Sequence, residues 1–298
     1  MDRKIKKSPG EHVFDTINVI FMVCIMFIML YPFWNTVVVS FNDARDSVRG
    51  GLFFWPRIFS LYNYEIVFSR QELLLAAWIS VARTVLGTFL NVILSALLAY
   101  ILSMKTFIFR RPLNLFLVLT MYVNAGLIPT FFLFRDLGLL ESFWVYIAPT
   151  LVGAFNVIII RTYISGLPDS YAEAARIEGA QELKIFFKVI FPLCMPVIAT
   201  VALWVAVGQW NSWFDTYIYN PGSQRLSTLQ FEMMKQISSS MNTAPPPSYL
   251  DGSRGGTNVT PNSLRAAITV VCTVPILLVY PFLQKYFVKG VQIGGVKE

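Results

Sequence analysis

The stretch TVLGTFLNVILSALLAYILSM, residues 84–104, decides how the rest of the chain is interpreted. It contains no Asp, Glu, Lys or Arg and is rich in Leu, Ile, Val and Phe. A helix needs about 20 such residues to cross the hydrocarbon core of a bilayer. The residues do not alternate between polar and apolar, as they would in a strand of a membrane β-barrel. The stretch therefore predicts a membrane-spanning helix.

Five more windows are free of the four charged residue types. They lie at 16–42, 112–134, 142–160, 189–214 and 266–284. Only 14% of the 298 residues are charged, against about 25% in an ordinary soluble domain. Six such windows favour a polytopic membrane protein over a globular protein with six buried helices. We expect an all-α fold within residues 14–288, with spans at about 16–40, 74–104, 112–134, 142–164, 189–214 and 264–286.

The distribution of Lys and Arg predicts the orientation. With the tails 1–13 and 289–298 in the cytoplasm, most basic residues of the short loops fall on the cytoplasmic side, in accordance with the positive-inside rule. We therefore expect a multi-pass protein of the cytoplasmic membrane with both termini inside. The net charge of +7 then reflects topology, and no basic stripe interleaved with aromatic residues indicates nucleic-acid binding.

The sequence carries little that indicates chemistry. His12 is the only histidine, and Cys24, Cys194 and Cys272 all fall inside predicted spans. No phosphate-binding glycine loop is present. We therefore expect no enzyme activity, metal or cofactor, and expect energy to come from a partner. Arg83 is the one charge more than three residues from the end of a span. We expect it to snorkel or to pair with an outer acid such as Glu65 or Glu72, a role in solute contact being the alternative.

The loop between the fourth and fifth spans, residues 166–192, begins GLPDSYAEAARIEGA. Pro168 with Asp169 or Ser170 predicts a helix start, and Gly179 its end. The small residues Ala172, Ala175 and Gly179 share one face, which would let a partner approach closely. Glu173 and Glu178 could reach basic groups on that partner.

A second short helix is expected directly after this segment. Leu183, Phe186, Phe187 and Ile190 form its apolar stripe, Lys184 and Lys188 share a polar face, and Pro192 ends it at the membrane. On spacing alone, an ordinary amphipathic surface loop remains an alternative to a docking site.

The loop closely resembles a known motif. Glu173-Ala174-Ala175, three residues, Gly179, nine residues and Val189-Ile190-Phe191-Pro192 resemble the EAA loop of permease subunits of binding-protein-dependent ABC importers of type I. The family prefers Ile and Leu where this chain has Val189 and Phe191, changes that conserve size and polarity. The segments 99–103, 126–130 and 287–297 are similar to maltose-type carbohydrate permeases, and 280–287 is similar to their oligosaccharide branch.

This resemblance implies a function and a set of partners. Glu173, Ala174, Ala175, Gly179 and Pro192 would belong to the coupling segment, whose helix sits in a cleft of a cytoplasmic ATPase. The partners would be a second, related permease, two copies of the ATPase and an extracellular solute-binding protein. ATP would be bound by the ATPase, and a sugar or oligosaccharide would cross the membrane. A membrane-embedded scaffold subunit without a transport path is the alternative function.

Candidate sugar contacts are amides and flat aromatic rings. Such side chains within the predicted spans are Gln209, Trp210, Asn211, Trp213, Asn124 and Asn156. Helix–helix hydrogen bonding or an interfacial aromatic belt is the alternative for each. The polar outer segment 217–263 is expected to contain a short helix at 226–237, with Leu229, Met233 and Gln236 on one face, and to contact the binding protein or border the cavity. A mobile connector is the alternative.

Overall fold

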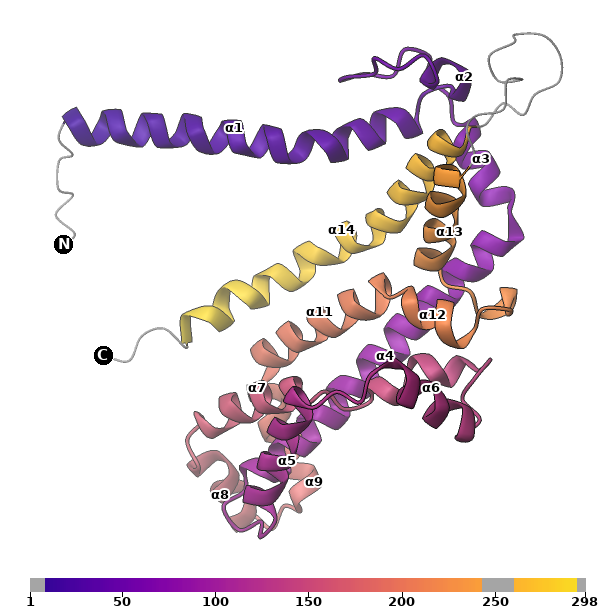
Figure 1. Cartoon of the computed structure of the whole chain (residues 1–298). Coiled ribbons are helices and arrows are strands. Elements are labelled where there is room, and N and C mark those ends of the chain that lie inside the picture. Colours follow the sequence, from indigo (N-terminus) through magenta and orange to yellow (C-terminus); the bar gives the residue numbers. More distant parts are fainter. Residues whose placement is uncertain (1–8, 243–259, 294–298) are drawn as a thin grey trace. The chain divides into compact units, whose positions relative to one another are not determined.

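A computed structural model describes residues 9–242 and 260–293 (Figure 1). Within these ranges the structure is helical, apart from one antiparallel bridge between Asn42 and Phe59, which agrees with the all-α fold predicted from the sequence. Three helices are long and apolar enough to cross a membrane, and three further pairs would bring the number to six if each bent pair is one span. The chain divides into two compact units, one with residues up to 69 and 236–271, the other with 70–235 and from 272 onward.

The first unit opens with the long helix α1 (Pro9–Ser40), followed by α2 (Ala44–Ser47) and α3 (Tyr62–Ser69). No residue in the most apolar 18-residue window of α1 is buried. A helix that is apolar all round needs lipid or protein to cover it. The turn after α1 is fixed by Asn63, whose amide nitrogen donates to the carbonyl oxygens of Ser40 and Asn42 at 3.0 Å each.

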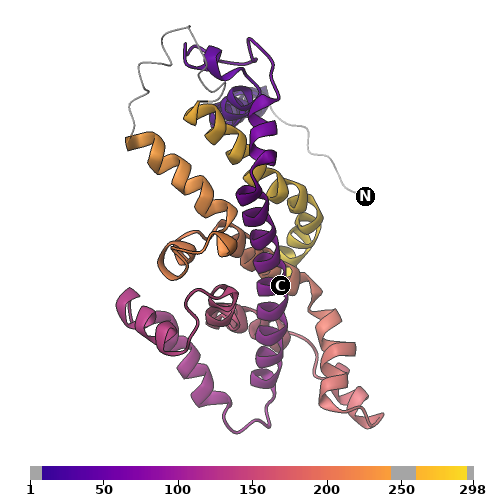
Figure 2. The ribbon, with the colours of Figure 1, turned by 90° about the vertical axis from the view of Figure 1, so that its right-hand side faces the viewer.

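The second unit is built around α4 (Gln71–Ser103), which packs against α7 (Ala154–Ser165) and α11 (Met195–Asn211). Figure 2 shows α4 as a long purple helix running through this unit. Its contact face contains small residues, so the helices approach closely. At Gly87 an added Cβ would lie only 2.9 Å from the Nε2 atom of Gln209 on α11.

The predicted third span, 112–134, is not one helix in the structure. It is divided into α5 (Arg110–Tyr122) and α6 (Leu127–Asp136), which meet at 118°. Gly126 sits between them with a φ of +87°, a conformation that favours glycine. The side-chain oxygen of Asn124 accepts the Gly126 N–H at 2.9 Å and stabilises this turn. Local turn chemistry thus overrides the continuous apolar pattern.

The predicted fourth span, 142–164, is also bent. It consists of the 3₁₀ turns η1 (Phe143–Tyr146) and η2 (Ala148–Thr150), followed by α7, with a bend of 43°. Pro149 and Gly153 lie at this bend, and both residues disfavour a continuous helix.

The predicted fifth span, 189–214, is also broken, because its first residues belong to a separate helical segment of α9 (Glu182–Ile185), the π-helical turn η3 (Phe186–Ile190) and α10 (Phe191–Leu193). This segment meets α11 at 83°. Pro192 and Pro196 stand four residues apart and lack the N–H groups that would continue the ladder across the bend. The helical run therefore passes through Pro192 and ends one residue later than the sequence suggested.

The apolar stripe of this segment differs from the expected one. Phe186 and Ile190 are buried as expected, together with Ile185, but Leu183 and Phe187 are 61% and 49% exposed. A π turn holds more residues than an α turn, so the buried face shifts relative to a regular α-helical pattern.

The outer segment contains α12 (Phe214–Tyr219), the turn η4 (Gln224–Leu226) and α13 (Leu229–Asn242), and the last helix is α14 (Pro261–Ile293). A helix therefore covers most of the expected 226–237 stretch, with Leu229 buried at its start. Residues 243–259, the Pro- and Gly-rich second half of the expected outer loop, lie outside the described residues, as do the basic N-terminal residues 1–8.

Candidate functional site

The EAA segment forms the helix α8 (Ser170–Ile177). Pro168 precedes it, and the amides of Tyr171 and Ala172 donate to the carbonyls of Pro168 and Asp169 at 3.4 and 3.1 Å. The alanine-rich sequence that follows has high helix propensity. The helix start predicted at Asp169 or Ser170 is therefore confirmed.

A Schellman motif ends α8. The N–H of Ala180 donates to the carbonyl oxygen of Ala175, and that of Gly179 to Arg176, both at 3.0 Å. The motif needs a residue with positive φ at Gly179, which has a φ of +79°. An added Cβ there would meet no atom within 4 Å, so only the backbone conformation requires glycine. The tight turn expected at Gly179 is present.

The two faces of α8 differ from the sequence expectation. Ala172 and Ala175, expected to face a partner, instead pack with Ala180 against the core of their own unit. The exposed face carries Tyr171, which is 49% exposed, and Ile177, which is 88% exposed. The small residues thus let α8 lie close to its own core, and a larger, partly apolar surface faces outward.

The acidic residues of α8 lie outside this packed face. Ala174, Glu173 and Glu178 are all exposed. No ion pair within 4 Å is recorded for Glu173 or Glu178 in the described part of the chain, so both carboxylates are available to a partner.

Polar contacts hold α8 to the rest of the unit, and we call them the α8 anchor. Asp169 pairs with Lys105, after the end of α4, at 2.5 Å. Glu182 on α9 pairs with Arg176 at 2.8 Å and accepts a hydrogen bond from the hydroxyl of Tyr100, on α4, at 2.6 Å. The hydrogen bonds from Lys105 and from Arg176 lower the pKa of Asp169 and of Glu182 respectively. The anchor thus joins α8 to α4 and α9 through charged groups.

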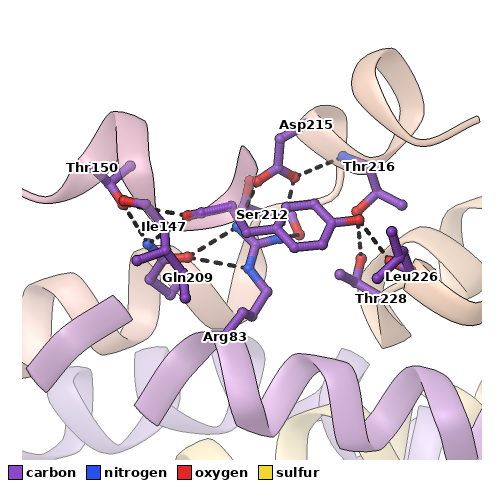
Figure 3. A network of polar contacts seen from close by, with 10 residues as sticks. Arg83, Ile147, Thr150, Gln209, Ser212, Asp215, Thr216, Leu226 and Thr228 are labelled. Atoms are coloured by element: carbon purple, nitrogen blue, oxygen red, sulfur yellow. Dashed lines mark hydrogen bonds and ion pairs between the residues drawn. The ribbon is translucent and has the colours of Figure 1, made fainter. Parts of the chain in front are cut away.

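A second polar cluster, drawn in Figure 3, surrounds Arg83 in the middle of α4. Arg83 is only 2% exposed, and its guanidinium pairs with Asp215 at 2.5 Å. It also donates to the side-chain oxygen of Gln209 at 3.0 and 3.1 Å and lies 4.4 Å from the ring centroid of Tyr146. The Tyr146 hydroxyl donates to the carbonyl of Leu226 at 2.6 Å. The cluster therefore joins α4, η1, α11, α12 and the start of the outer segment.

Arg83 pairs with an acid directly after the fifth predicted span, as expected of an outer acid, but the two acids named as examples were wrong. It pairs with Asp215 rather than with Glu65 or Glu72, while Glu72 accepts a hydrogen bond from Gln224 at 3.3 Å. Asp215 lies 132 residues from Arg83 along the chain, so no local pattern links them. The one signal available was its position directly after the charge-free window 189–214.

Two of the predicted sugar contacts, Gln209 and Asn156, form buried or partly buried hydrogen bonds between helices. The amide nitrogen of Gln209 donates to the Thr150 hydroxyl at 2.8 Å. The amide nitrogen of Asn91 donates to the backbone carbonyl of Thr150 at 2.5 Å. Asn156 in turn donates to Asn91 at 3.0 Å. Gln209 and Asn156 thus serve as links between helices in this structure, the alternative kept open above.

The remaining predicted contacts are placed differently. Trp210 is buried and donates to the carbonyl of Cys272 at 2.9 Å. Asn211 is exposed and accepts from Gln230 at 3.3 Å. Trp213 lies edge-on to Phe214, with ring centroids 5.7 Å apart. Asn124 is exposed at the α5–α6 turn.

Other places in the described residues offer little to a sugar or metal. A hollow of about 700 Å³ is lined by α4, α11, Pro275 and Ile276. Its lining is almost wholly apolar apart from Thr84 and Thr88, whereas a sugar needs convergent polar groups. No group of three or more His, Cys, Asp or Glu side chains in this part of the chain could hold a metal ion.

Comparisons with known proteins identify the family of the chain. A family model described as "Binding-protein-dependent transport system inner membrane component" matches residues 9–293. The chain is 36% identical to the polygalacturonan/rhamnogalacturonan transport system permease protein YtcP of Bacillus subtilis, over 96% of this chain and 99% of that protein. It is 33% identical to the protein LplC of the same organism, over 97% of each. The crystal structure of a bacterial ABC transporter involved in import of the acidic polysaccharide alginate contains a chain that matches with a TM-score of 0.86 and 27% identity, covering 95% of this chain and all of the other.

Proposed function

The chain belongs to the family of binding-protein-dependent transport system inner membrane components, and we propose that it forms half of the channel through which an ABC importer passes a sugar or oligosaccharide. The relatives named for polygalacturonan and rhamnogalacturonan and for alginate support a carbohydrate as the solute. We place the protein in the cytoplasmic membrane, with several crossings and both termini inside.

The outward face of α8 carries this proposal. Ile177 is 88% exposed and Tyr171 49% exposed on a helix whose other face packs against its own core. A single exposed apolar side chain is common on protein surfaces, so the support comes from its position on the helix that resembles the EAA segment, beside the exposed carboxylates of Glu173 and Glu178. The proposed partner is the cytoplasmic ATPase, in two copies, one for this chain and one for a second, related permease. ATP is bound by the ATPase, and this chain needs no cofactor.

The anchor of α8 supports a route from the ATPase to the membrane helices. A displacement of α8 acts on α4 through Tyr100 and Lys105, and on α11 through the α9–α10 segment. Closure of the ATPases on ATP would thus reorient both helices and open the channel toward an extracellular solute-binding protein. The outer segment 217–263 is the proposed contact for that protein, since the Arg83 cluster ties its beginning to α4.

The proposed solute path uses the exposed candidates first. Asn211, Trp213 and Asn124 are not buried, and they offer amide and ring surfaces to a sugar. The other three candidates donate their side-chain N–H groups to protein atoms: these are Gln209, Trp210 and Asn156. We therefore propose that they support the path rather than contact the sugar.

The experiment that tests this function is ATP-driven uptake by the complete transporter in proteoliposomes. We expect Ile177→Asp to abolish co-purification of the ATPase and ATP-driven uptake. Leu137→Asp places the same charge on another exposed apolar residue, 62% exposed at the end of α6, and should leave the ATPase bound. Normal ATPase binding and uptake with Ile177→Asp would contradict the docking assignment.

A further inference from the structure

Three arginines surround a hollow between α5 and α7. Arg110 and Arg111 begin α5, Arg161 comes from α7, and together with Asn114 they line a space of about 410 Å³. Asn114 stands one helical turn beyond Arg110, about 6 Å along the axis. The hollow therefore extends from the start of α5 toward its middle.

The positive charge of this hollow is not neutralised by the described residues. None of the three arginines has a carboxylate within 4 Å among the ion pairs of residues 9–242 and 260–293. Asn114 holds the arrangement, because its oxygen accepts from Arg161 at 2.6 Å and its nitrogen donates to the carbonyl of Arg110 at 2.5 Å. Three like charges kept together without a counter-charge favour an anion between them.

One donor in the cluster also lacks a partner. The Nε atom of Arg161 is buried and makes no hydrogen bond. A buried donor left unpaired is costly, and such groups are rare unless a ligand or water satisfies them. The arginine fork offers several N–H groups in one plane, which matches the oxygens of a phosphate. The hollow thus has both the charge and the free donor that an oxyanion needs.

The surroundings indicate where the anion comes from. No residue of α5 is buried, and Ile108 and Phe109, directly before it, are 88% and 62% exposed. Leu115 and Phe116, farther along α5, are both 61% exposed. Basic groups next to such apolar side chains suit the boundary between lipid headgroups and acyl chains, where basic pockets between helices bind anionic headgroups.

We propose that this hollow binds the phosphate of an anionic phospholipid, such as phosphatidylglycerol, with Arg110, Arg111 and Arg161 as its ligands. The site shares no residue with the α8 surface or with the solute candidates, and it does not depend on which solute is carried. Bound lipid would supply the counter-charge that keeps α5 and α7 together at this end.

The test uses the purified complete transporter and short-chain lipids. Binding of dioctanoyl phosphatidylglycerol and dioctanoyl phosphatidylcholine is measured by native mass spectrometry, with inorganic phosphate and trigalacturonate as competitors. We expect preferential binding of phosphatidylglycerol and about a fivefold weaker affinity for each arginine replaced. Arg111→Gln is the first variant because Arg111 is exposed, Arg161→Lys retains the charge but not the fork, and Lys184→Gln is the control for loss of an exposed charge elsewhere.

Each outcome decides the source of the anion. Equal binding of the two lipids, or equal behaviour of Arg111→Gln and Lys184→Gln, overturns the proposal. If millimolar phosphate displaces the lipid, the hollow is an oxyanion site that binds free phosphate in addition to the lipid headgroup. Displacement by trigalacturonate at lower concentrations than phosphate assigns the hollow to the solute path and overturns the lipid assignment. Because no uptake is measured, failure here leaves the transport function unaffected.

Discussion

At the scale of single residues, Arg83 is a buried charge with three hydrogen-bond partners. A buried ion pair loses the hydration of both charges, so it is stable only when further hydrogen bonds satisfy the remaining donors. Arg83 meets this condition, because Asp215, Gln209 and the carbonyl of Ser212 together accept from its guanidinium. Its position in α4 therefore indicates a structural function in joining helices.

Replacing Arg83 by Met leaves Asp215 with an uncompensated, partly buried charge. We expect a loss of about 3–5 kcal/mol of stability, the usual cost of breaking a buried pair, seen as a lower thermal unfolding midpoint in detergent. Adding Asp215→Asn should restore part of the loss because it removes the unpaired charge. Arg135→Gln breaks an exposed pair with Asp136 and should cost about 1 kcal/mol or less. An equally mild effect of Arg83→Met would contradict the network.

Glu182 makes the α8 anchor sensitive to pH. Hydrogen bonds from Arg176 and Tyr100 lower its pKa below the usual 4.5. A carboxyl with a lowered pKa contributes its stabilisation above the usual value, and this is lost as the pH falls through the lowered pKa. Corrected amide exchange of α8 should therefore show constant protection from pH 7 down to about 5 and lose it below that.

The control for this prediction is Glu182→Gln, which should have weaker protection of α8 already at neutral pH. The loss of protection that remains in this variant should begin at a lower pH, because it comes from Asp169. The hydrogen bond from Lys105 lowers the pKa of Asp169 from 3.8. An unchanged exchange profile in this variant would show that Glu182 does not hold α8.

At the scale of elements, α8 and α6 end in the same motif. In both, a glycine with positive φ follows the helix, Gly179 at +79° and Gly138 at +67°, and in both an added Cβ would meet no atom within 4 Å. The hydrogen bonds correspond too, since Leu139 donates to Phe134 as Ala180 does to Ala175. The two positions therefore form a matched pair for separating backbone strain from coupling.

Valine at either glycine forces a β-branched residue into a left-handed conformation, at a cost of about 1–2 kcal/mol. We expect Gly179→Val and Gly138→Val to lower stability similarly, but only Gly179→Val to lower ATP-driven uptake relative to ATP hydrolysis, by about tenfold, the effect of about 1.4 kcal/mol. Gly179→Asn should retain most of the uptake because asparagine tolerates this conformation. Equal uptake in the two valine variants would argue against a special role for the α8 turn.

The sequence predicted the helices that are determined by residues close together along the chain. The charge-free windows located the apolar helices, and Pro168, Ser170 and Gly179 located α8 with its ends. The break at Gly126 was not predicted, because hydropathy does not register turn geometry, whereas the helix end at Pro192 was predicted to within one residue. The inward face of Ala172 and Ala175 and the pairing of Arg83 with Asp215 depend on tertiary packing, which residue spacing alone does not determine.

At the scale of the whole molecule, we propose that the chain is a channel subunit moved from the cytosol. Its membership in the family rests on a match over residues 9–293, and its coupling rests on one exposed helix face. Within its own unit, α1 has no buried residue in its most apolar window, α5 has none, and the 700 Å³ hollow of the second unit has an apolar lining. In a membrane, such surfaces are covered by lipid or by other transmembrane helices.

The most direct test of this central claim is site-specific crosslinking of α8 in the complete transporter. In a variant without Cys24, Cys194 and Cys272, cysteine is placed either at Ala174, on the exposed face, or at Ala172, which packs against its own core. We predict that Ala174→Cys crosslinks to the ATPase subunit in an ATP-dependent manner and that Ala172→Cys does not. Labelling of Ala174→Cys in intact cells by an impermeant extracellular reagent, without a crosslink to the ATPase, would contradict the account.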